Sequence, residues 1–102
     1  MSTSRSRLIV RGETIPALKA HVLLRFDDLR KAWVLLAPEH IYWPDEIAVA
    51  ILQKLDGSCD VTAIINALAQ DYDAPVDDVG ADVTEFLQTW ADQRLIQHME
   101  AR

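Results

Sequence analysis

The side chains that can carry acid–base chemistry are few and scattered in this chain of 102 residues. The histidines are His21, His40 and His98, and they lie far apart in the sequence. His40 follows Glu39 directly, and a carboxylate beside an imidazole can act as an acid–base pair. A turn with solvated polar side chains explains this dipeptide better. The chain has no Ser–His–Asp order and no glycine-rich phosphate loop, so we predict no catalytic residue.

Metal and prosthetic-group sites are not indicated either. The three acidic pairs each have a local explanation as turn residues or as first-turn residues of a helix, and they are Asp27-Asp28, Asp45-Glu46 and Asp77-Asp78. Cys59 is the only cysteine, which excludes an internal disulfide and argues against a zinc site built from cysteines. A carrier domain needs a serine in an Asp-Ser context, but Ser58 follows Gly57. We expect no metal and no cofactor.

The composition predicts one folded domain that does not bind nucleic acid. Half of the residues are hydrophobic and the formal net charge is −6. The first eleven residues carry three arginines and no acid, so the rest of the chain has a net charge of −9. Nucleic-acid affinity depends largely on Lys and Arg that neutralise phosphates, and a duplex would repel this body. The N-terminus lacks the apolar segment of a signal peptide and no apolar run approaches the ~20 residues of a membrane span, so we expect a cytoplasmic protein without membrane contact.

Strand patterns come first along the chain. We expect a flexible N-terminal tail over residues 1–15, a folded domain over 16–98 and a C-terminal tail over 99–102. Within the N-terminal tail, docking of the apolar patch Leu8-Ile9-Val10 on the body stays an alternative. The runs 21–26, 33–36 and 40–43 are rich in strand-forming residues and are joined by short connections. Short connections favour antiparallel pairing. The sequence therefore predicts a small three-stranded antiparallel sheet.

Helix signals follow in the second half of the chain. Pro44 suits the first position of a helix over about 44–55, and Gly57 suits a left-handed stop after it. Asp60 is a candidate cap for a second helix, and Pro75 opens a third that ends near 91–94. Leu95-Ile96 is a last extended piece. The fold class is therefore α+β, a winged-helix-like domain in which the sheet precedes a three-helix bundle.

A winged helix suggests DNA binding, which the third helix tests. Between Pro75 and Arg94 there are five acidic side chains, and Arg94 is the single basic one. A recognition helix with this balance would place carboxylates against phosphates. A DNA-associated winged-helix regulator stays an alternative, but the residues for base readout are missing.

Aromatic side chains mark a possible groove. Tyr42 and Trp43 lie on the short third strand, and Phe86 and Trp90 lie on the third helix. If these elements adjoin, the four side chains line one groove, although strand alternation sends Tyr42 and its neighbours to opposite faces. A competing interpretation, that Phe86 and Trp90 only fill the core, stays open. A strand edge beside such a helix can accept a foreign strand.

The sequence resembles the PqqD proteins of pyrroloquinoline quinone (PQQ) biosynthesis, which are recognition elements for ribosomally made peptides that are modified after translation (RiPPs). The matching residues are Pro16-Ala17-Leu18, Arg25-Phe26-Asp27, Trp33 to Glu39, Ile51-Leu52, Asp56-Gly57, Ile64-Ile65, Asp82-Val83 and Phe86-Leu87. The segment Trp43-Pro44-Asp45 departs from the family pattern, in which a Leu and an Asn or Asp more often precede the first helix.

The resemblance implies a non-enzymatic peptide chaperone. Its partners would be the precursor peptide PqqA and the radical S-adenosylmethionine (SAM) enzyme PqqE, which cross-links a Glu and a Tyr of the precursor. The peptide would add as a strand to the third strand and pack against the third helix. The implied peptide-binding residues are His40, Ile41, Tyr42 and Trp43 for backbone pairing, Val83, Phe86, Leu87 and Trp90 for side-chain pockets, and Arg94 as a polar anchor. A structural subunit that touches an enzyme but no peptide is a third possibility.

Overall fold

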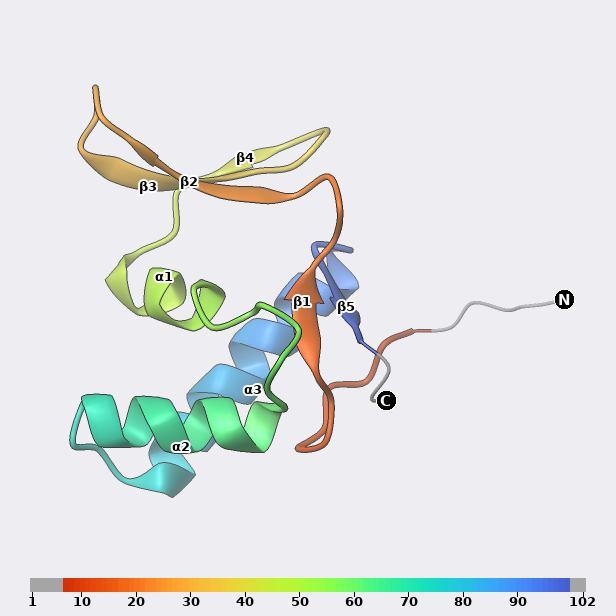
Figure 1. Ribbon diagram of the computed structural model, residues 1–102, viewed down its shortest axis with the longest axis vertical. Coiled ribbons are helices and arrows are strands. Elements are labelled where there is room, and N and C mark those ends of the chain that lie inside the picture. Colours follow the sequence, from red (N-terminus) through yellow and green to blue (C-terminus); the bar gives the residue numbers. More distant parts are fainter. Residues whose placement is uncertain (1–6, 100–102) are drawn as a thin grey trace, which may run out of the picture.

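The computed structural model describes residues 7–99, which form two small antiparallel sheets and three helices (Figure 1). The elements are β1 (Pro16–Leu18), β2 (Leu23–Asp27), β3 (Ala32–Leu36), β4 (Ile41–Tyr42), α1 (Glu46–Leu52), α2 (Val61–Asp71), α3 (Val76–Asp92) and β5 (Ile96–His98). This is a mixed α+β domain. In Figure 1 the sheet of β2, β3 and β4 lies at one end of the molecule, with the helices on one side of it.

The three-stranded sheet has the order β2-β3-β4 and is antiparallel throughout, as the sequence predicts. Leu24 and Tyr42 both pair with Leu35, so the three side chains share one face. Leu35 is buried in the core, and Leu24 and Tyr42 pack against it. On the other face, Leu23 and Ile41 flank Leu36 and are exposed. The sheet therefore has a core face and a free apolar face.

A second sheet joins the two ends of the domain and was not expected. β1 pairs with β5 in antiparallel register, with Pro16 opposite His98 and Leu18 opposite Ile96. The side chains of Pro16 and Ile96 are almost completely buried. The sequence analysis recognised an extended piece near residue 96 but gave it no partner. The arrangement of a sheet followed only by helices is therefore corrected, because the last strand returns to the first.

Aspartates cap the N-termini of α1 and α2, and both predicted boundaries of α1 are corrected. The Asp45 side chain accepts a hydrogen bond from the Ala48 N–H at 2.8 Å, so α1 begins after Asp45 and not at Pro44. The same helix ends at Leu52, earlier than expected, and Gly57 (φ 80°) lies in the following loop. Asp60 caps α2 as predicted, by accepting from the Ala63 N–H at 2.9 Å.

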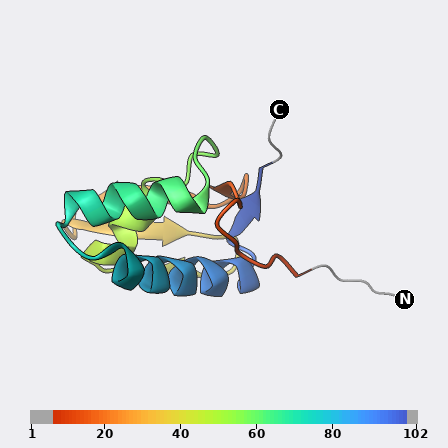
Figure 2. The ribbon, with the colours of Figure 1, turned by 90° about the horizontal axis from the view of Figure 1, so that it is seen from below.

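The core lies between the inner face of the sheet and the three helices. Leu35, Ile51, Ile64 and Leu87 are among its most deeply buried side chains, one from each of these four elements. Figure 2 shows α2 and α3 side by side, and these two helices pack directly on each other. Within residues 7–99, no helix is both long and apolar enough to cross a bilayer.

The segment before β1 is part of the folded body, which corrects the predicted tail for residues 7–15. Val10 is buried in the core, and its N–H donates to the Gln88 Oε1 atom at 2.9 Å. The first two residues of α2 have N–H groups without a partner in the helix, and this segment supplies one for each. The Val61 N–H donates a hydrogen bond to the Thr14 carbonyl, and the Thr62 N–H donates one to the Gly12 carbonyl. The predicted domain start at residue 16 therefore falls inside packed structure. Residues 1–6 and 100–102 of the predicted tails lie outside the described part.

The docking of this segment is testable with a matched pair of variants. Val10→Ala removes two buried methyl groups and should lower the free energy of unfolding by about 1.5–2.5 kcal/mol, from the transfer of each group plus the cavity it leaves. Ile9→Ala, at an exposed neighbour, should change it by less than about 0.5 kcal/mol. Urea unfolding of the full chain measures both. Equal stability of the two variants would show that Val10 does not anchor the segment.

Candidate functional site

The far edge of β4 pairs with no strand among the described residues. At the turn, the Ala37 N–H donates to the His40 carbonyl at 3.0 Å, and the register then places Ile41 opposite Leu36 and Tyr42 opposite Leu35. Bonded and non-bonded pairs alternate in an antiparallel ladder, so Tyr42 bonds to Leu35. The N–H and carbonyl groups of Ile41 consequently point to the free edge. They are the groups that an added strand would use.

An aromatic slot adjoins this edge on the core face of the sheet. It is a cavity of about 470 Å³ lined by Tyr42, Asp82, Glu85, Phe86, Thr89, Trp90 and Gln93. The rings of Phe86 and Trp90 lie 5.4 Å apart and tilted by 37°. Tyr42 and Phe86 are only partly buried and so present their rings to the slot. The structure therefore brings together three of the predicted site residues, from β4 and α3.

The rim of the slot is acidic. Asp82 and Glu85 are exposed residues of α3, and no Lys or Arg is among the residues that line this cavity. An apolar floor with a negative rim suits an apolar peptide side chain next to uncharged or basic neighbours. The same carboxylates oppose contact with a phosphate backbone, so this geometry does not support a DNA-associated regulator.

Two predicted pocket residues lie beneath the slot instead of in it. Leu87 is 0 % exposed and Val83 is 2 % exposed. Along α3 the residues 83, 87 and 90 form the buried stripe, whereas 82, 86, 89 and 93 form the stripe that lines the slot. Trp90 belongs to both, because it is buried and still borders the cavity. The prediction that Val83 and Leu87 form pockets together with Phe86 and Trp90 is corrected for this cavity, because neither residue lines it.

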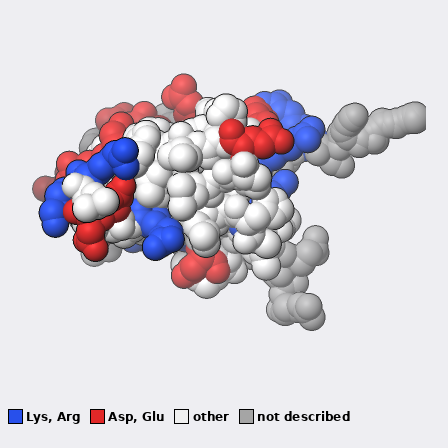
Figure 3. Space-filling view, turned by 90° about the horizontal axis from the view of Figure 1, so that it is seen from above, with Lys and Arg blue, Asp and Glu red and all other residues white. Residues whose placement is uncertain are grey.

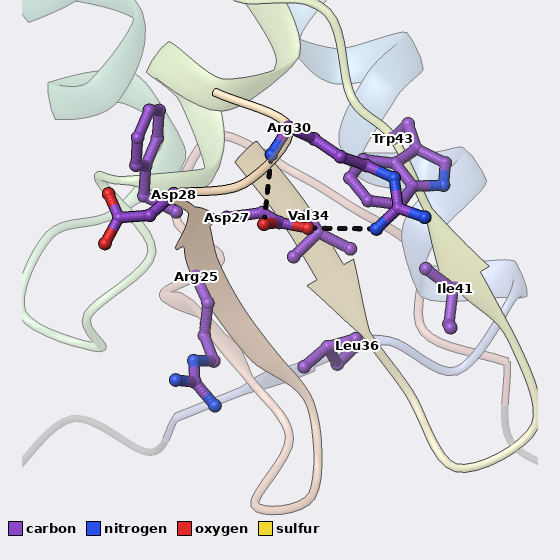
Figure 4. A pocket seen from close by; sticks show the side chains of 9 residues that line it. Arg25, Asp27, Asp28, Arg30, Val34, Leu36, Ile41 and Trp43 are labelled. Atoms are coloured by element: carbon purple, nitrogen blue, oxygen red, sulfur yellow. Dashed lines mark hydrogen bonds and ion pairs between the residues drawn. The ribbon is translucent and has the colours of Figure 1, made fainter. Parts of the chain in front are cut away.

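Ile41 and Trp43 face the opposite side of the sheet, so the prediction that Trp43 shares a groove with Tyr42 and Phe86 is wrong. They line a hollow of about 380 Å³ on the free face, together with Arg25, Phe26, Asp27, Asp28, Arg30, Val34 and Leu36 (Figure 4). Figure 3, seen from the sheet end, shows a broad uncharged surface with charged groups at its margins. The exposed side chains of Leu23, Ile41 and Trp43 belong to this face.

Charged groups fix one wall of this hollow. The Arg30 guanidinium lies 5.3 Å from the centre of the Trp43 ring and pairs with the Asp27 carboxylate at 3.2 Å. The Arg30 N–H donates to the same carboxylate, and this bond is the main reason that the pKa of Asp27 lies below its usual range. The side of Trp43 that meets Arg30 is therefore held in place.

His40 and Arg94 lie together in a third hollow, next to the aromatic slot. This hollow has a volume of about 260 Å³, and it shares Tyr42 and Gln93 with the slot. Arg94 follows the end of α3 and has a positive φ of 64°, which turns the chain toward β5. The predicted polar anchor is thus close to the predicted backbone-pairing residues. The Glu39-His40 dipeptide sits at the turn between β3 and β4.

Sequence reasoning missed four of the slot residues, which are Asp82, Glu85, Thr89 and Gln93. All four lie within one or two helical turns of Phe86, so helical spacing from that residue is the signal that could have found them. No group of three or more His, Cys, Asp or Glu side chains in residues 7–99 is placed to hold a metal ion. The arrangement offers hydrogen-bonding backbone and apolar surface, which are the means of binding an extended peptide.

Comparison with known proteins agrees with this chemistry. The model of the family described as "Coenzyme PQQ synthesis protein D (PqqD)" matches residues 32–96, from β3 to the start of β5. A "PqqA binding protein" of Rhodopseudomonas palustris is 52 % identical over 87 residues, which cover 85 % of this chain and 85 % of the relative. A protein of the same name in Xanthomonas oryzae is 43 % identical over 82 residues, which cover 80 % of this chain and 89 % of the relative.

Solved structures are similar as well. The solution structure of the PqqD truncation of Methylobacterium extorquens PqqCD, described as a functional and stand-alone RiPP recognition element, superposes with a TM-score of 0.74 at 38 % identity, covering 87 % of this chain and 95 % of that one. The crystal structure of PqqD from Xanthomonas campestris gives a TM-score of 0.55 at 36 % identity, covering 86 % of this chain and 98 % of that one. The chain belongs to the PqqD family.

Proposed function

We propose that this protein binds the precursor peptide PqqA by strand addition to β4 and presents it to the radical SAM enzyme PqqE in PQQ biosynthesis. The observation that carries the proposal is the free edge at Ile41 beside the aromatic slot. The names of the curated relatives support the peptide, and the Methylobacterium domain supports the role of a recognition element.

Strand addition explains how one short strand can hold a flexible peptide. The backbone groups of Ile41 give hydrogen bonds that do not depend on the peptide sequence, and the hollows give preference for side chains. Alternate side chains of an added strand point to opposite faces of the sheet. One set would meet Tyr42, Phe86 and Trp90 in the slot, and the other would meet Ile41 and Trp43 on the free face.

The polar end of the groove completes the proposed site. His40 and Arg94 border the hollow that continues from the slot past Tyr42 and Gln93. Arg94 is the basic side chain at this end, so it suits a peptide carboxylate or carbonyl. The proposed contacts are therefore His40, Ile41, Tyr42, Trp43, Phe86, Trp90 and Arg94. A winged-helix-like description of the fold also stays a prediction, supported by the order of small sheet and helices.

The proposed role is delivery without chemistry. A peptide held as an ordered strand has already lost much of its conformational entropy. Binding of the peptide to its enzyme therefore no longer carries that free-energy cost. Docking of the complex on the enzyme also raises the local concentration of the peptide. Both effects require only binding surfaces, and these are what residues 7–99 provide.

A proline at the free edge tests strand addition. Ile41→Pro removes the N–H that faces the added strand and should weaken binding of PqqA at least about tenfold. Ile41→Ala keeps this N–H and should bind within about threefold of the parent, because the exposed side chain alone contributes little. Isothermal titration calorimetry with synthetic PqqA measures both. Equal affinity of the two variants, with both folded, would exclude pairing at Ile41.

Two neighbouring residues of α3 separate binding from folding. Leu87→Ala empties a core position and should cost about 2–5 kcal/mol of unfolding free energy, with little change in peptide affinity of the folded protein. Phe86→Ala should cost about 1–2 kcal/mol, because the ring is only partly buried, and should weaken PqqA binding about tenfold. Urea unfolding and titration measure the two effects. The opposite pattern would place the peptide elsewhere.

Delivery predicts a specific loss in the reaction. Without this protein, PqqE should cleave S-adenosylmethionine unproductively while cross-linking of PqqA is slowed or abolished. Adding the parent should restore cross-linking, and adding Ile41→Pro should not. Product analysis of both reactions by mass spectrometry measures this. Full cross-linking without the protein would show that delivery is not its role.

A further inference from the structure

A further hollow lies toward the other end of α3, and the proposed function has not assigned it a role. It is an apolar notch of about 220 Å³ between α1, the end of α2 and the start of α3, lined by Ile47, Ile51, Leu68, Tyr72, Ala74, Val79, Asp82 and Val83. The floor is rigid, because Ile51, Leu68 and Val83 are core residues. The rim is open, since Ile47 and Tyr72 are large side chains left about half exposed.

The size and chemistry of the notch suit one apolar side chain. Pockets for small molecules usually measure about 300–1,000 Å³ and contain several polar groups that fix orientation. This notch is smaller, and its only charged lining residue is Asp82. An anchor side chain that enters such a pocket is the usual way in which a peptide gains affinity.

The notch and the aromatic slot are neighbouring hollows on α3 that share one lining residue. Asp82 lines both hollows, on the α3 surface between them. The chain also leads from one to the other, because β4 is followed by Trp43-Pro44-Asp45 and then by α1, whose Ile47 forms the notch rim (Figure 1). A strand added to β4 that continues along α3 therefore arrives at the notch.

The spacing of the two hollows defines the peptide that fits. Val79 and Val83 line the notch, and Phe86 and Trp90 line the slot, so each pair is offset by seven residues of helix. Seven residues rise about 10 Å along a helix. An extended peptide covers that distance with about three residues. Both hollows lie on the α3 side of the added strand, where only every second side chain points, so the two peptide side chains that occupy them are four positions apart.

We propose that the notch is a second side-chain subsite of the peptide groove, which takes an apolar residue of the bound precursor four positions from the residue in the aromatic slot. This inference rests on the proposed function. The peptide residues between the two anchors pass Asp82 and Glu85, so they are uncharged or basic, because an acidic residue there would meet like charge.

Variants of the exposed rim test the subsite with little risk to folding. Ile47→Ser and Tyr72→Ser each remove one half-exposed wall of the notch, and each should weaken binding of synthetic PqqA about fivefold to twentyfold. Val76→Ser is the matched control, because Val76 is 50 % exposed against 47 % for Ile47 and does not line the notch. The control should bind like the parent.

An alanine scan of the PqqA peptide identifies the occupant. One apolar peptide residue should lose affinity on substitution when tested with the parent and lose almost none when tested with Ile47→Ser, which is the signature of two side chains in contact. A second peptide residue, four positions away, should show the same coupling with Phe86→Ala.

The outcomes separate the two proposals. A parent protein that does not bind PqqA would overturn the proposed function, and the subsite with it. If the parent binds PqqA and both Ile47→Ser and Tyr72→Ser bind it equally well, the subsite alone is overturned. Unchanged peptide binding together with loss of PqqE binding or of self-association in these variants would also overturn it, by assigning the notch to another partner.

Discussion

Successive residues of β4 face opposite sides of the sheet, and the rest of the site depends on this alternation. The strand is two residues long, so one residue faces each side of the sheet. Tyr42 turns its ring to the core and its backbone to Leu35, whereas Ile41 turns its side chain to the free face and its backbone to the open edge. A shift of one residue in register would bury Ile41 and expose the Tyr42 ring, and the aromatic slot would lose one wall. The pairing of Leu35 with Tyr42 therefore sets both the edge and the slot.

Local signals in the sequence were sufficient for most elements and insufficient for those made by distant residues. The three strands, the Asp60 cap and the acidic third helix follow from patterns within a few residues. The pairing of Pro16 with His98 does not, because nothing near either residue encodes its partner. The roles of Phe86 and Leu87 are decided in the same way. The two are adjacent apolar residues of the third helix, and only the position of β4 and the other helices makes one a slot wall and the other a core residue.

The segment of residues 7–15 was predicted as a tail because of its basic composition, although it packs on the body. Arg7 donates two hydrogen bonds of 2.8 Å to Asp92, and these bonds lower the pKa of Asp92 and raise that of Arg7. A carboxyl pKa that is lowered by folding adds stability above its unfolded value and loses it as pH falls through the folded value. This pair is exposed and contributes little. The burial of Val10 is the larger effect, and the short apolar run of residues 8–10 between arginines gives only a weak sequence signal.

Core residues also lie beneath the hollows of the proposed peptide groove. Leu87 is buried under the slot without lining it and Val83 lines the notch, so the shape of both hollows exists before any peptide arrives. A preformed surface loses little entropy on binding, and the cost of ordering falls mainly on the peptide. In the proposed complex, that cost would be offset by backbone bonds at Ile41 and by side chains that enter the hollows. The proposed binding would hold the precursor in one extended conformation, and positioning of this kind is what a reaction between two side chains of one peptide requires.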